Sequence, residues 1–351
     1  MPELPEVETV ARDLRPRVAG ATISGARVSW VRTLRSENPA GFAELVTGRR
    51  IEDVGRRAKL VVLDLSGGLA LTIHLKMTGQ LFVVSGGVPE DPYVRAVVEL
   101  ADGRELRFRD IRKFGRIGLS RRDEATGDLV GELGGPKDFK GFGPEPLDPS
   151  FTLAAFRKRL RGRRGRLKPL LTDQAFVAGV GNIYADEALW MARLHPLRSA
   201  PTLKPADERR LYLALRTILA EAVERRGASI DDYTAPDGDG EMQERLQVYQ
   251  RTGEPCPRCG RPIRRVVIGG RATHFCSWCQ RLPGADRKSA ASILRAMTGP
   301  RMRGRGGRWT ELAAGDGAVG LTSDEQARLR TERTRRAAAS RRAAARTAGA
   351  R

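Results

Sequence analysis

Hydrophobic residues follow two different periodicities along this chain, and the change between them falls near residue 131. Between residues 21 and 120, short apolar runs such as KLVVLDL, LALTIHL and VRAVVEL are separated by Gly, Pro, Asp or Ser. This pattern predicts several short β-strands, and strands at roughly even spacing favour a β-sandwich or a flattened barrel. The dipeptide Asp102-Gly103 lies between two of the runs and predicts a tight hairpin turn, where glycine accepts a positive φ.

Helical spacing marks the beginning of the chain and its second half. Residues 2–18 predict a helix that carries Leu4, Val7, Val10 and Leu14 along one stripe. Three further helices are predicted at 151–161, 182–193 and 207–226.

Composition divides the chain into five parts. A stretch dense in Gly and Pro predicts a linker, and residues 228–244 predict an irregular loop. After Gln280 the chain is rich in Arg, Ala and Gly and has no hydrophobic stripe near its end, so we expect disorder there. The sequence therefore predicts an α+β protein with a β-sandwich domain at 2–130, a linker at 131–150, a helical domain at 151–248, a cysteine module at 249–280 and a basic low-complexity tail at 281–351.

The four cysteines form two pairs, Cys256-x₂-Cys259 and Cys276-x₂-Cys279, with 16 residues between the pairs. Four thiolates on two short knuckles can close a tetrahedron around Zn²⁺ and leave no position for water, so the expected zinc ion is structural. The residues between the pairs predict a β-hairpin with Gly269-Gly270 at its tip. Arg271 follows that tip, either as an ordinary solvated arginine or as a functional cation.

The net charge of +21 favours a polyanionic partner, because Lys and Arg neutralise phosphates and release their counterions. Part of the surplus lies in the tail, but the preceding 280 residues are basic as well. The acidic N-terminus does not resemble a signal peptide, and no apolar run of about 18 residues predicts a membrane span. We expect a protein of the reducing cytoplasm with no membrane association.

Six features occur in order over residues 2–280: MPELPEVETV, IHLKMTG, RDIRKFG, GPEPL, VAGVGNIYADE and the cysteine module. In this combination the chain resembles the formamidopyrimidine-DNA glycosylase family. The resemblance implies an N-terminal β-sandwich, a helix-two-turn-helix domain and a zinc finger. It also implies a monomeric glycosylase and AP lyase that removes damaged bases from double-stranded DNA.

A reaction of this kind needs a nucleophile, and Pro2 can supply one. Removal of Met1 would leave a secondary amine, and α-amino groups titrate near pH 8, so a fraction is neutral at pH 7. Attack on the anomeric carbon would expel the base and leave a Schiff base, from which the 3′ and then the 5′ phosphate are eliminated. Taken alone, proline is merely a common second residue.

Two acidic residues follow Pro2. The resemblance assigns Glu3 as the acid that protonates the departing sugar oxygen, and its place beside the amine suits general acid–base work. Glu6 lies one helical turn further on. It either supports the amine or only complements the dipole at a helix N-terminus.

The resemblance gives Lys59, in the sequence RRAK, contacts to flanking phosphates and a part in base removal. It gives Arg271 the leaving phosphate, where a cation stabilises developing negative charge. Met77, Arg112 and Phe114 match the side chains that fill the hole left by a flipped base. Met77 could otherwise belong to the core, and His74 either touches a phosphate or is a satisfied core histidine.

Further DNA contacts are expected in the helical domain. Asn182 begins a helix after two glycines, so we expect it to cap that helix and to leave N–H groups open to a phosphate. The segment 156–168 holds eight basic residues in thirteen, with Arg163 and Lys168 at positions that the resemblance assigns to DNA. Asp91 stands where some family members carry a phosphate-contacting histidine, so one contact is lost or moved. We expect the tail to raise nonspecific DNA affinity or to bind partners.

Three functions remain in competition. Leu4 in PELPE resembles the branch that excises oxidised purines such as 8-oxoguanine and formamidopyrimidines. The endonuclease VIII branch, which acts on oxidised pyrimidines, usually has glycine there. A noncatalytic zinc-finger protein descended from the enzyme is the third candidate, and the presence of Pro2, Glu3 and Lys59 argues against it.

Overall fold

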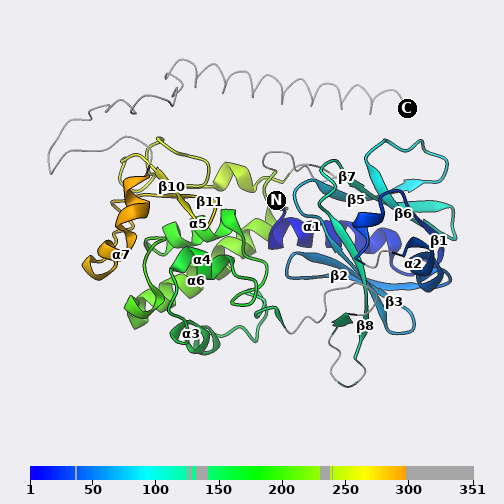
Figure 1. Ribbon diagram of the computed structural model, residues 1–351, viewed down its shortest axis with the longest axis horizontal. Coiled ribbons are helices and arrows are strands. Elements are labelled where there is room, and N and C mark those ends of the chain that lie inside the picture. The colour runs from blue at the N-terminus through cyan, green and yellow to red at the C-terminus, as the bar shows by residue number, and fades with distance from the viewer. Residues whose placement is uncertain are drawn as a thin grey trace, which may run out of the picture. The chain divides into compact units, whose positions relative to one another are not determined.

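Two antiparallel sheets from the strand-rich part of the chain share one hydrophobic core (Figure 1). The predicted β-sandwich is therefore confirmed, and Gly103, with φ of 83°, lies in the turn between β6 and β7 as expected. The four-stranded sheet has the order β1 (Ile23–Val28), β6 (Val94–Leu100), β7 (Arg104–Asp110), β5 (Gly79–Ser85). The five-stranded sheet has the order β2 (Ile51–Arg57), β3 (Leu60–Leu65), β4 (Leu69–His74), β8 (Arg116–Arg122), β9 (Leu129–Gly131).

The structure is a computed structural model, and the residues that it describes fall within one unit, Met1–Gly299. Within the described ranges, each helix is too short or too polar to cross a lipid bilayer. These ranges are residues 1–35, 38–123, 125, 129–131, 141–229, 238 and 240–297.

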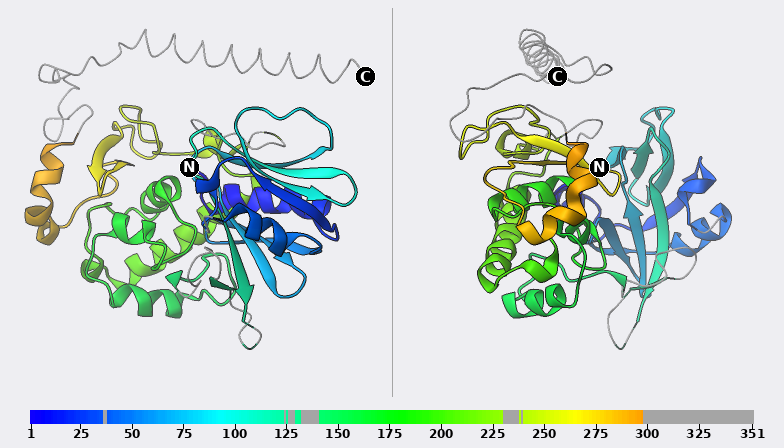
Figure 2. Two further views of the ribbon diagram at one scale, coloured as in Figure 1. Left: turned by 45° about the vertical axis from the view of Figure 1, so that its right-hand side comes forward. Right: turned by 60° about the vertical axis from the view of Figure 1, so that its left-hand side comes forward.

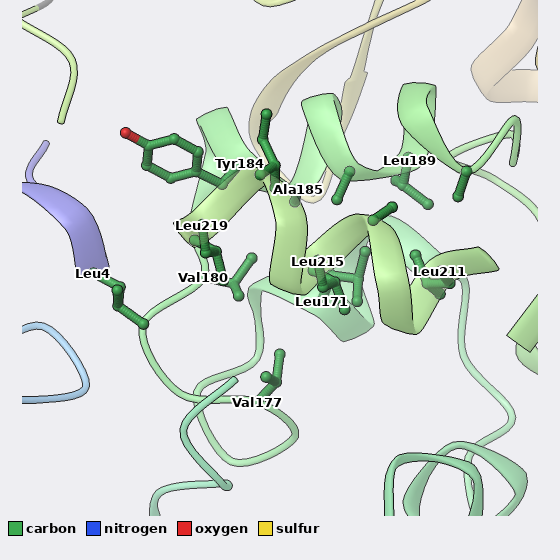
Figure 3. Close-up of a cluster of buried hydrophobic side chains, with 14 of the residues drawn as sticks. Leu4, Leu171, Val177, Val180, Tyr184, Ala185, Leu189, Leu211, Leu215 and Leu219 are labelled. Carbon is green, nitrogen blue, oxygen red and sulfur yellow. The ribbon is translucent and has the colours of Figure 1, made fainter. Parts of the chain in front are cut away.

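Helix α1 (Leu4–Val18) confirms the predicted N-terminal helix, but its apolar stripe is divided between two cores. Val7, Val10 and Leu14 are buried against the sheets, where helix α2 (Pro39–Val46) also packs. Leu4 instead lies in the core of the helical domain, at the edge of the cluster drawn in Figure 3. The first turn of α1 thus precedes the strands of the sandwich in the sequence, but its Leu4 packs in the helical domain.

The helical domain contains the three predicted helices with small shifts at their ends. Helix α4 was not predicted, because six residues are too few to display a helical period. The helices are α3 (Leu153–Arg161), α4 (Leu167–Thr172), α5 (Asn182–Met191) and α6 (Pro205–Glu224), with short 3₁₀ turns at Ala200–Thr202 and Met242–Arg245. A further 3₁₀ turn, Val31–Thr33, belongs to the sandwich.

The cysteine module contains the predicted hairpin of β10 (Arg264–Ile268) and β11 (Arg271–Phe275). Gly269 and Gly270 form its tip with φ values of 56° and 73°, a region that favours glycine.

The predicted start of the tail at residue 281 is wrong, because helix α7 (Gly284–Arg295) follows the finger. Its Ala290 is buried with Val266, Ile268 and Phe275, and Ile293 and Leu294 pack against the same cluster. These apolar residues are spaced as one helical face that the Arg- and Ala-rich composition concealed. The expected disorder of the rest of the tail, from residue 298, lies outside the described residues.

The predicted linker and loop are described only in part. Glu145 within the linker accepts hydrogen bonds from the Arg57 side chain and the Ala58 backbone, both at 2.7 Å, so this end of the linker is fixed to the sandwich. Residues 132–140 of the linker, and 230–237 and 239 of the loop, lie outside the described residues.

Candidate active site

The carboxylate of Glu3 occupies the N-terminus of helix α5. Its oxygens accept hydrogen bonds from the backbone N–H groups of Gly181 at 2.6 Å and Ile183 at 2.8 Å, and the residue is 1% exposed. Unpaired N–H groups and the helix dipole both favour an anion at this end of a helix. The sequence predicted an open anion site here, and that prediction is wrong because the protein's own side chain fills it. Pro2, which precedes Glu3, is buried at the same junction.

The predicted helix cap by Asn182 is also wrong. Gly181 is the N-cap residue of α5, and the Asn182 side chain donates a hydrogen bond to the carbonyl oxygen of Ala272 at 2.9 Å. Asn182 therefore ties α5 to strand β11, one residue after Arg271. A carboxylate from the far N-terminus performs the capping, and local sequence spacing cannot reveal such a partner.

Glu6 fixes the backbone on which Glu3 and Pro2 stand. One of its carboxylate oxygens accepts the Glu3 backbone N–H at 2.8 Å. The other accepts the Tyr184 hydroxyl at 2.5 Å and the Ala228 backbone N–H at 2.8 Å, and Figure 3 shows that hydroxyl directed toward the start of α1. Burial, and secondly the charge of Glu3, raise the pKa of Glu6. Glu6 thus holds the chain's end in place, which is the supporting role that the sequence left open.

Lys59 reaches the same place from the turn between β2 and β3. A Cβ added to Gly181 would lie 2.5 Å from the Lys59 Nζ and 2.3 Å from the Glu3 carboxyl carbon, so these groups meet at Gly181. Burial lowers the pKa of Lys59, Glu3 and Glu6 oppose this shift, and the positive charge of Arg271 adds to it. Glu3 and Arg271 therefore both act on the charge of Lys59, and Pro2 directly precedes Glu3 in the chain.

Strand β11, which carries Arg271, is held against α5 by a buried carboxylate. Asp186 accepts the His274 backbone N–H at 2.8 Å and pairs with the Lys168 Nζ at 2.6 Å. Lys168 is 1% exposed, so its predicted contact with a DNA phosphate is wrong. It neutralises Asp186, and a buried charge needs such a partner. Arg271 itself is exposed at the tip of the hairpin.

The sequence interpretation missed Tyr184, Asp186 and Glu187, which follow one another closely in α5. Glu187 is buried and accepts the backbone N–H groups of residues 247–249 at 2.8 to 2.9 Å, which fixes the approach to the finger. The sequence does contain a sign of these buried acids. Asp186 and Glu187 are adjacent and stand between apolar residues, in a helix that is buried on nearly every side. Such acids need partners, and these partners lie elsewhere in the chain.

Met77, Arg112 and Phe114 lie in two adjacent loops of the sandwich. The Thr78 hydroxyl donates to buried Asp110 at 2.5 Å, and the Arg112 backbone N–H lies 3.2 Å from both side chains. Phe114 is 48% exposed, and the Arg112 guanidinium lies over its ring at 5.1 Å. Phe114 and Arg112 are exposed and Met77 is half-buried, and apolar and cationic groups gathered in this way suit insertion into a base stack.

His74 lies at the base of the Met77 loop. Its Nδ1 accepts the Lys76 backbone N–H at 3.1 Å. Burial, and secondly the charges of Lys76 and Lys59, lower its pKa to about 3. His74 is therefore neutral at pH 7, and of its two predicted roles the structural one fits the observed contacts.

Arg163 and Asp91 are the two remaining positions at which the sequence bore on DNA contact. Arg163 is exposed, with its guanidinium 5.9 Å from the ring of Phe176. Asp91, in place of the expected histidine, pairs with Arg109, so its charge is neutralised within the protein.

The four cysteine sulfurs lie within 4.8 Å of one another, with Cys256–Cys279 at 4.0 Å and Cys259–Cys276 at 3.5 Å. A tetrahedral zinc with Zn–S bonds of about 2.3 Å requires sulfurs about 3.8 Å apart, so the donor set fits. The four cysteines form a site for one structural zinc ion. The finger is attached to α5 through Arg258, whose guanidinium lies 3.7 Å from the centre of the Trp190 ring.

A β-sandwich, a helical domain and a Cys₄ finger meet around the N-terminal end of the chain, and this arrangement defines the class of zinc-finger DNA glycosylases. Three family models match: the formamidopyrimidine-DNA glycosylase N-terminal domain at residues 1–117, its H2TH domain at 142–234, and the zinc finger found in FPG and IleRS at 253–282. The chain belongs to the formamidopyrimidine-DNA glycosylase family.

Relatives and solved structures agree with this assignment. Formamidopyrimidine-DNA glycosylases of Chloroflexus aurantiacus and Pelotomaculum thermopropionicum are 47% and 44% identical, over 80% of this chain and 98% and 100% of theirs. The MutM (FPG) protein of Thermus thermophilus is 44% identical with a TM-score of 0.70, covering 80% of this chain and 100% of its own. Lactococcus lactis Fpg in complex with abasic-site DNA is 34% identical with a TM-score of 0.71, covering 80% and 99%.

Gly181→Ala tests the close approach at the centre of the site. The new methyl group would collide with Glu3 and Lys59, so we expect the free energy of unfolding in urea to fall by about 1–3 kcal/mol. Gly165→Ala is the matched control, because a Cβ there meets nothing within 4 Å and its expected change is within about 0.5 kcal/mol. Equal stability of the two variants would contradict the described packing.

Proposed function

We propose that this protein excises oxidised purines from double-stranded DNA and then cleaves the strand through a Schiff base on Pro2. The observation that supports the proposal is the capture of Glu3, the residue after Pro2, by the N-terminus of α5, where the Lys59 Nζ also approaches Gly181. Solved relatives support the substrate class, because Lactococcus lactis Fpg was crystallised with DNA containing N7-benzyl-Fapy-dG and with abasic-site DNA.

Pro2 and Glu3 perform the first step. After removal of Met1, the Pro2 nitrogen bonds to the anomeric carbon of the damaged nucleotide, and the base departs with the bonding electrons and takes up a proton from water. Glu3 takes a proton from the Pro2 amine and delivers it to the ring oxygen of the sugar as the ring opens. The resulting iminium makes the C2′ hydrogen acidic, and loss of that proton to water expels the 3′ phosphate with the electrons of its C–O bond. Loss of the C4′ proton then expels the 5′ phosphate in the same way.

Two cations assist at the phosphates. Lys59 contacts the phosphates that flank the lesion, and Arg271 stabilises the charge on the departing phosphate from the tip of the hairpin. Burial lowers the pKa of Lys59, and the positive charge of Arg271 contributes to this shift. This interaction supports one anionic ligand that both cations share. Arg163 adds a contact to the backbone, which sets register without reading sequence.

The exposed loops of the sandwich keep the duplex open. Met77 and Phe114 wedge into the space that the flipped nucleotide leaves, and Arg112 bonds the orphaned partner base. The duplex loses a few kcal/mol in unstacking, and these contacts compensate for part of it. We further propose that the protein works as a monomer in the cytoplasm, on the DNA of the nucleoid, since a single lesion has no two-fold symmetry.

Borohydride trapping tests the nucleophile. The full chain is expected to form a covalent adduct with abasic-site DNA after reduction, and Pro2→Gly is expected to weaken it at least about tenfold because a primary amine replaces the secondary one. Glu6→Gln, which keeps a side chain able to accept hydrogen bonds, should retain more adduct than Glu3→Gln. An unchanged adduct in Pro2→Gly would overturn the proposed nucleophile, and absence of an adduct in the unaltered chain would favour a noncatalytic protein.

The alkaline limb of the pH–rate profile tests Lys59. Burial lowers its pKa below the ordinary value of 10.5, so its positive charge, and the activity that needs it, is lost at a lower pH than for an exposed lysine. Lys59→Arg keeps the charge to above about pH 12 and should move the alkaline fall in kcat/KM upward, even where the maximum rate is lower. The exposed Lys158→Arg serves as control and should leave the limb in place. A limb that Lys59→Arg does not move would exclude Lys59 as the titrating group.

The lesion class is tested by comparing duplexes that carry 8-oxoguanine with duplexes that carry thymine glycol. We expect faster cutting of the 8-oxoguanine duplex, measured as kcat/KM at one ionic strength. Leu4 is buried in the helical core and contacts Gly179. It therefore supports the purine assignment through the resemblance of PELPE to that branch of the family, and not through contact with the lesion. Preference for thymine glycol would assign the chain to the oxidised-pyrimidine function.

A further inference from the structure

Helix α7 gives the zinc finger a second surface. It lies beyond residue 282, where the match to the zinc-finger family model ends. Asp286 of α7 accepts a hydrogen bond from the Thr202 hydroxyl at 3.1 Å, so the helix is attached to the helical domain as well as to the finger. In Figure 1 and in the left view of Figure 2, α7 lies on the opposite side of β10 and β11 from the N-terminus. This surface is therefore distinct from the candidate active site.

A cavity of about 330 Å³ lies between α7 and the finger. Much of its lining is apolar and comes from Phe275 and Leu282 on the finger side and Leu294 and Met297 on the helix side. Its volume is at the low end of the range for ligand sites, which suits one or two side chains rather than a large cofactor. An apolar hollow of this size is a feature that a partner's apolar side chain could fill.

Three arginines lie in the lining of this cavity or beside Trp278 next to it. Arg281 and Arg287 line the cavity, and Arg281 also lies 4.3 Å from the ring centre of Trp278. Arg261 stacks on the same ring at 3.7 Å, and Trp278 is 39% exposed. Arg287 donates a hydrogen bond to the Leu282 carbonyl oxygen at 3.3 Å, and within the described residues none of the three guanidiniums forms an ion pair with a carboxylate. We call Arg261, Trp278, Arg281 and Arg287 the arginine rim.

The charge around the rim is strongly one-sided. Residues 256–297 contain nine Lys and Arg against a single acidic residue, Asp286, which is buried. Several arginines of the helical domain instead form ion pairs within the protein, as Arg157 and Arg161 do with Glu208. Guanidiniums that form no ion pair within the protein offer planar pairs of N–H donors, a geometry that matches carboxylates.

We propose that the cavity and the arginine rim form a docking site for an acidic peptide segment of a partner protein. An apolar side chain of the segment enters the cavity, and its carboxylates pair with Arg261, Arg281 and Arg287. Duplex DNA matches the charge but presents no apolar side chain that could fill the cavity, so the combination favours a peptide. Stacked Trp and Arg side chains are also the residues that most often dominate binding energy at protein interfaces.

The test uses the full chain and a fluorescein-labelled peptide of sequence Glu-Glu-Asp-Asp-Leu-Phe, followed by fluorescence anisotropy. We expect saturable binding in the micromolar range. Replacing Leu-Phe by Ser-Ser in the peptide should weaken binding at least about tenfold, and so should Arg281→Glu or Arg287→Glu in the protein. Arg209→Glu, an exposed residue of α6 with the same charge change, is the control and should bind as the unaltered chain does.

Arg281 is close to the zinc knuckle, so zinc content and abasic-site cleavage are measured for each variant. Arg287→Glu and Leu294→Ser lie on α7, outside the knuckles, and decide the outcome if Arg281→Glu loses zinc. Absence of saturable binding up to about 1 mM peptide, or an equal loss with Arg209→Glu, would overturn the proposal. Displacement of the peptide by an undamaged 12-base-pair duplex would overturn it too and assign the rim to DNA.

Discussion

A carboxylate bound to the N-terminus of a buried helix is the contact on which the rest of the site depends. Glu3 would be costly to bury alone, because an isolated carboxylate loses its hydration without compensation. The backbone N–H groups of Gly181 and Ile183 and the dipole of α5 supply that compensation. Position 181 favours glycine, since a side chain there would overlap Glu3 and Lys59 unless these groups shifted. The geometry of the chain's first residues is thus imposed by a helix that begins far away in sequence.

Helix α5 connects every part of the described structure. Tyr184 bonds Glu6 of the sandwich helix, Asp186 bonds Lys168 and the hairpin strand, and Glu187 bonds the backbone that leads to the finger. Each is buried, so each polar group depends on its partner, and removal of one member of a buried ion pair costs about 3–5 kcal/mol. The buried polar side chains of α5 therefore hold the sandwich, the helical domain and the finger together.

Sequence reasoning predicted the architecture because local patterns determine it. Strand runs, helical stripes and cysteine spacing are visible within a few residues, and they yielded the sandwich, four helices, the hairpin and the zinc site. Predictions from the sequence were wrong where the partner of a residue lies far away in the chain. Lys168 stood in a basic run that resembles a DNA-binding face, yet its partner Asp186 removes it from the surface. Asn182 occupied a typical capping position, but Glu3 performs the capping. Helix α7 was missed because composition was weighed over the spacing of its few apolar residues.

The division of α1 between two hydrophobic cores bears on how the molecule loses its structure. Leu4 is buried with the helical domain, whereas Val7 and Leu14 are buried with the sheets, all on fifteen consecutive helical residues. Melting that helix would expose apolar surface in both domains at once, so neither domain can unravel through it alone. Domains that share an element in this way lose the thermodynamic independence that separate cores usually allow. The sandwich and the helical domain therefore make up one cooperative unit, despite the boundary that composition draws between them.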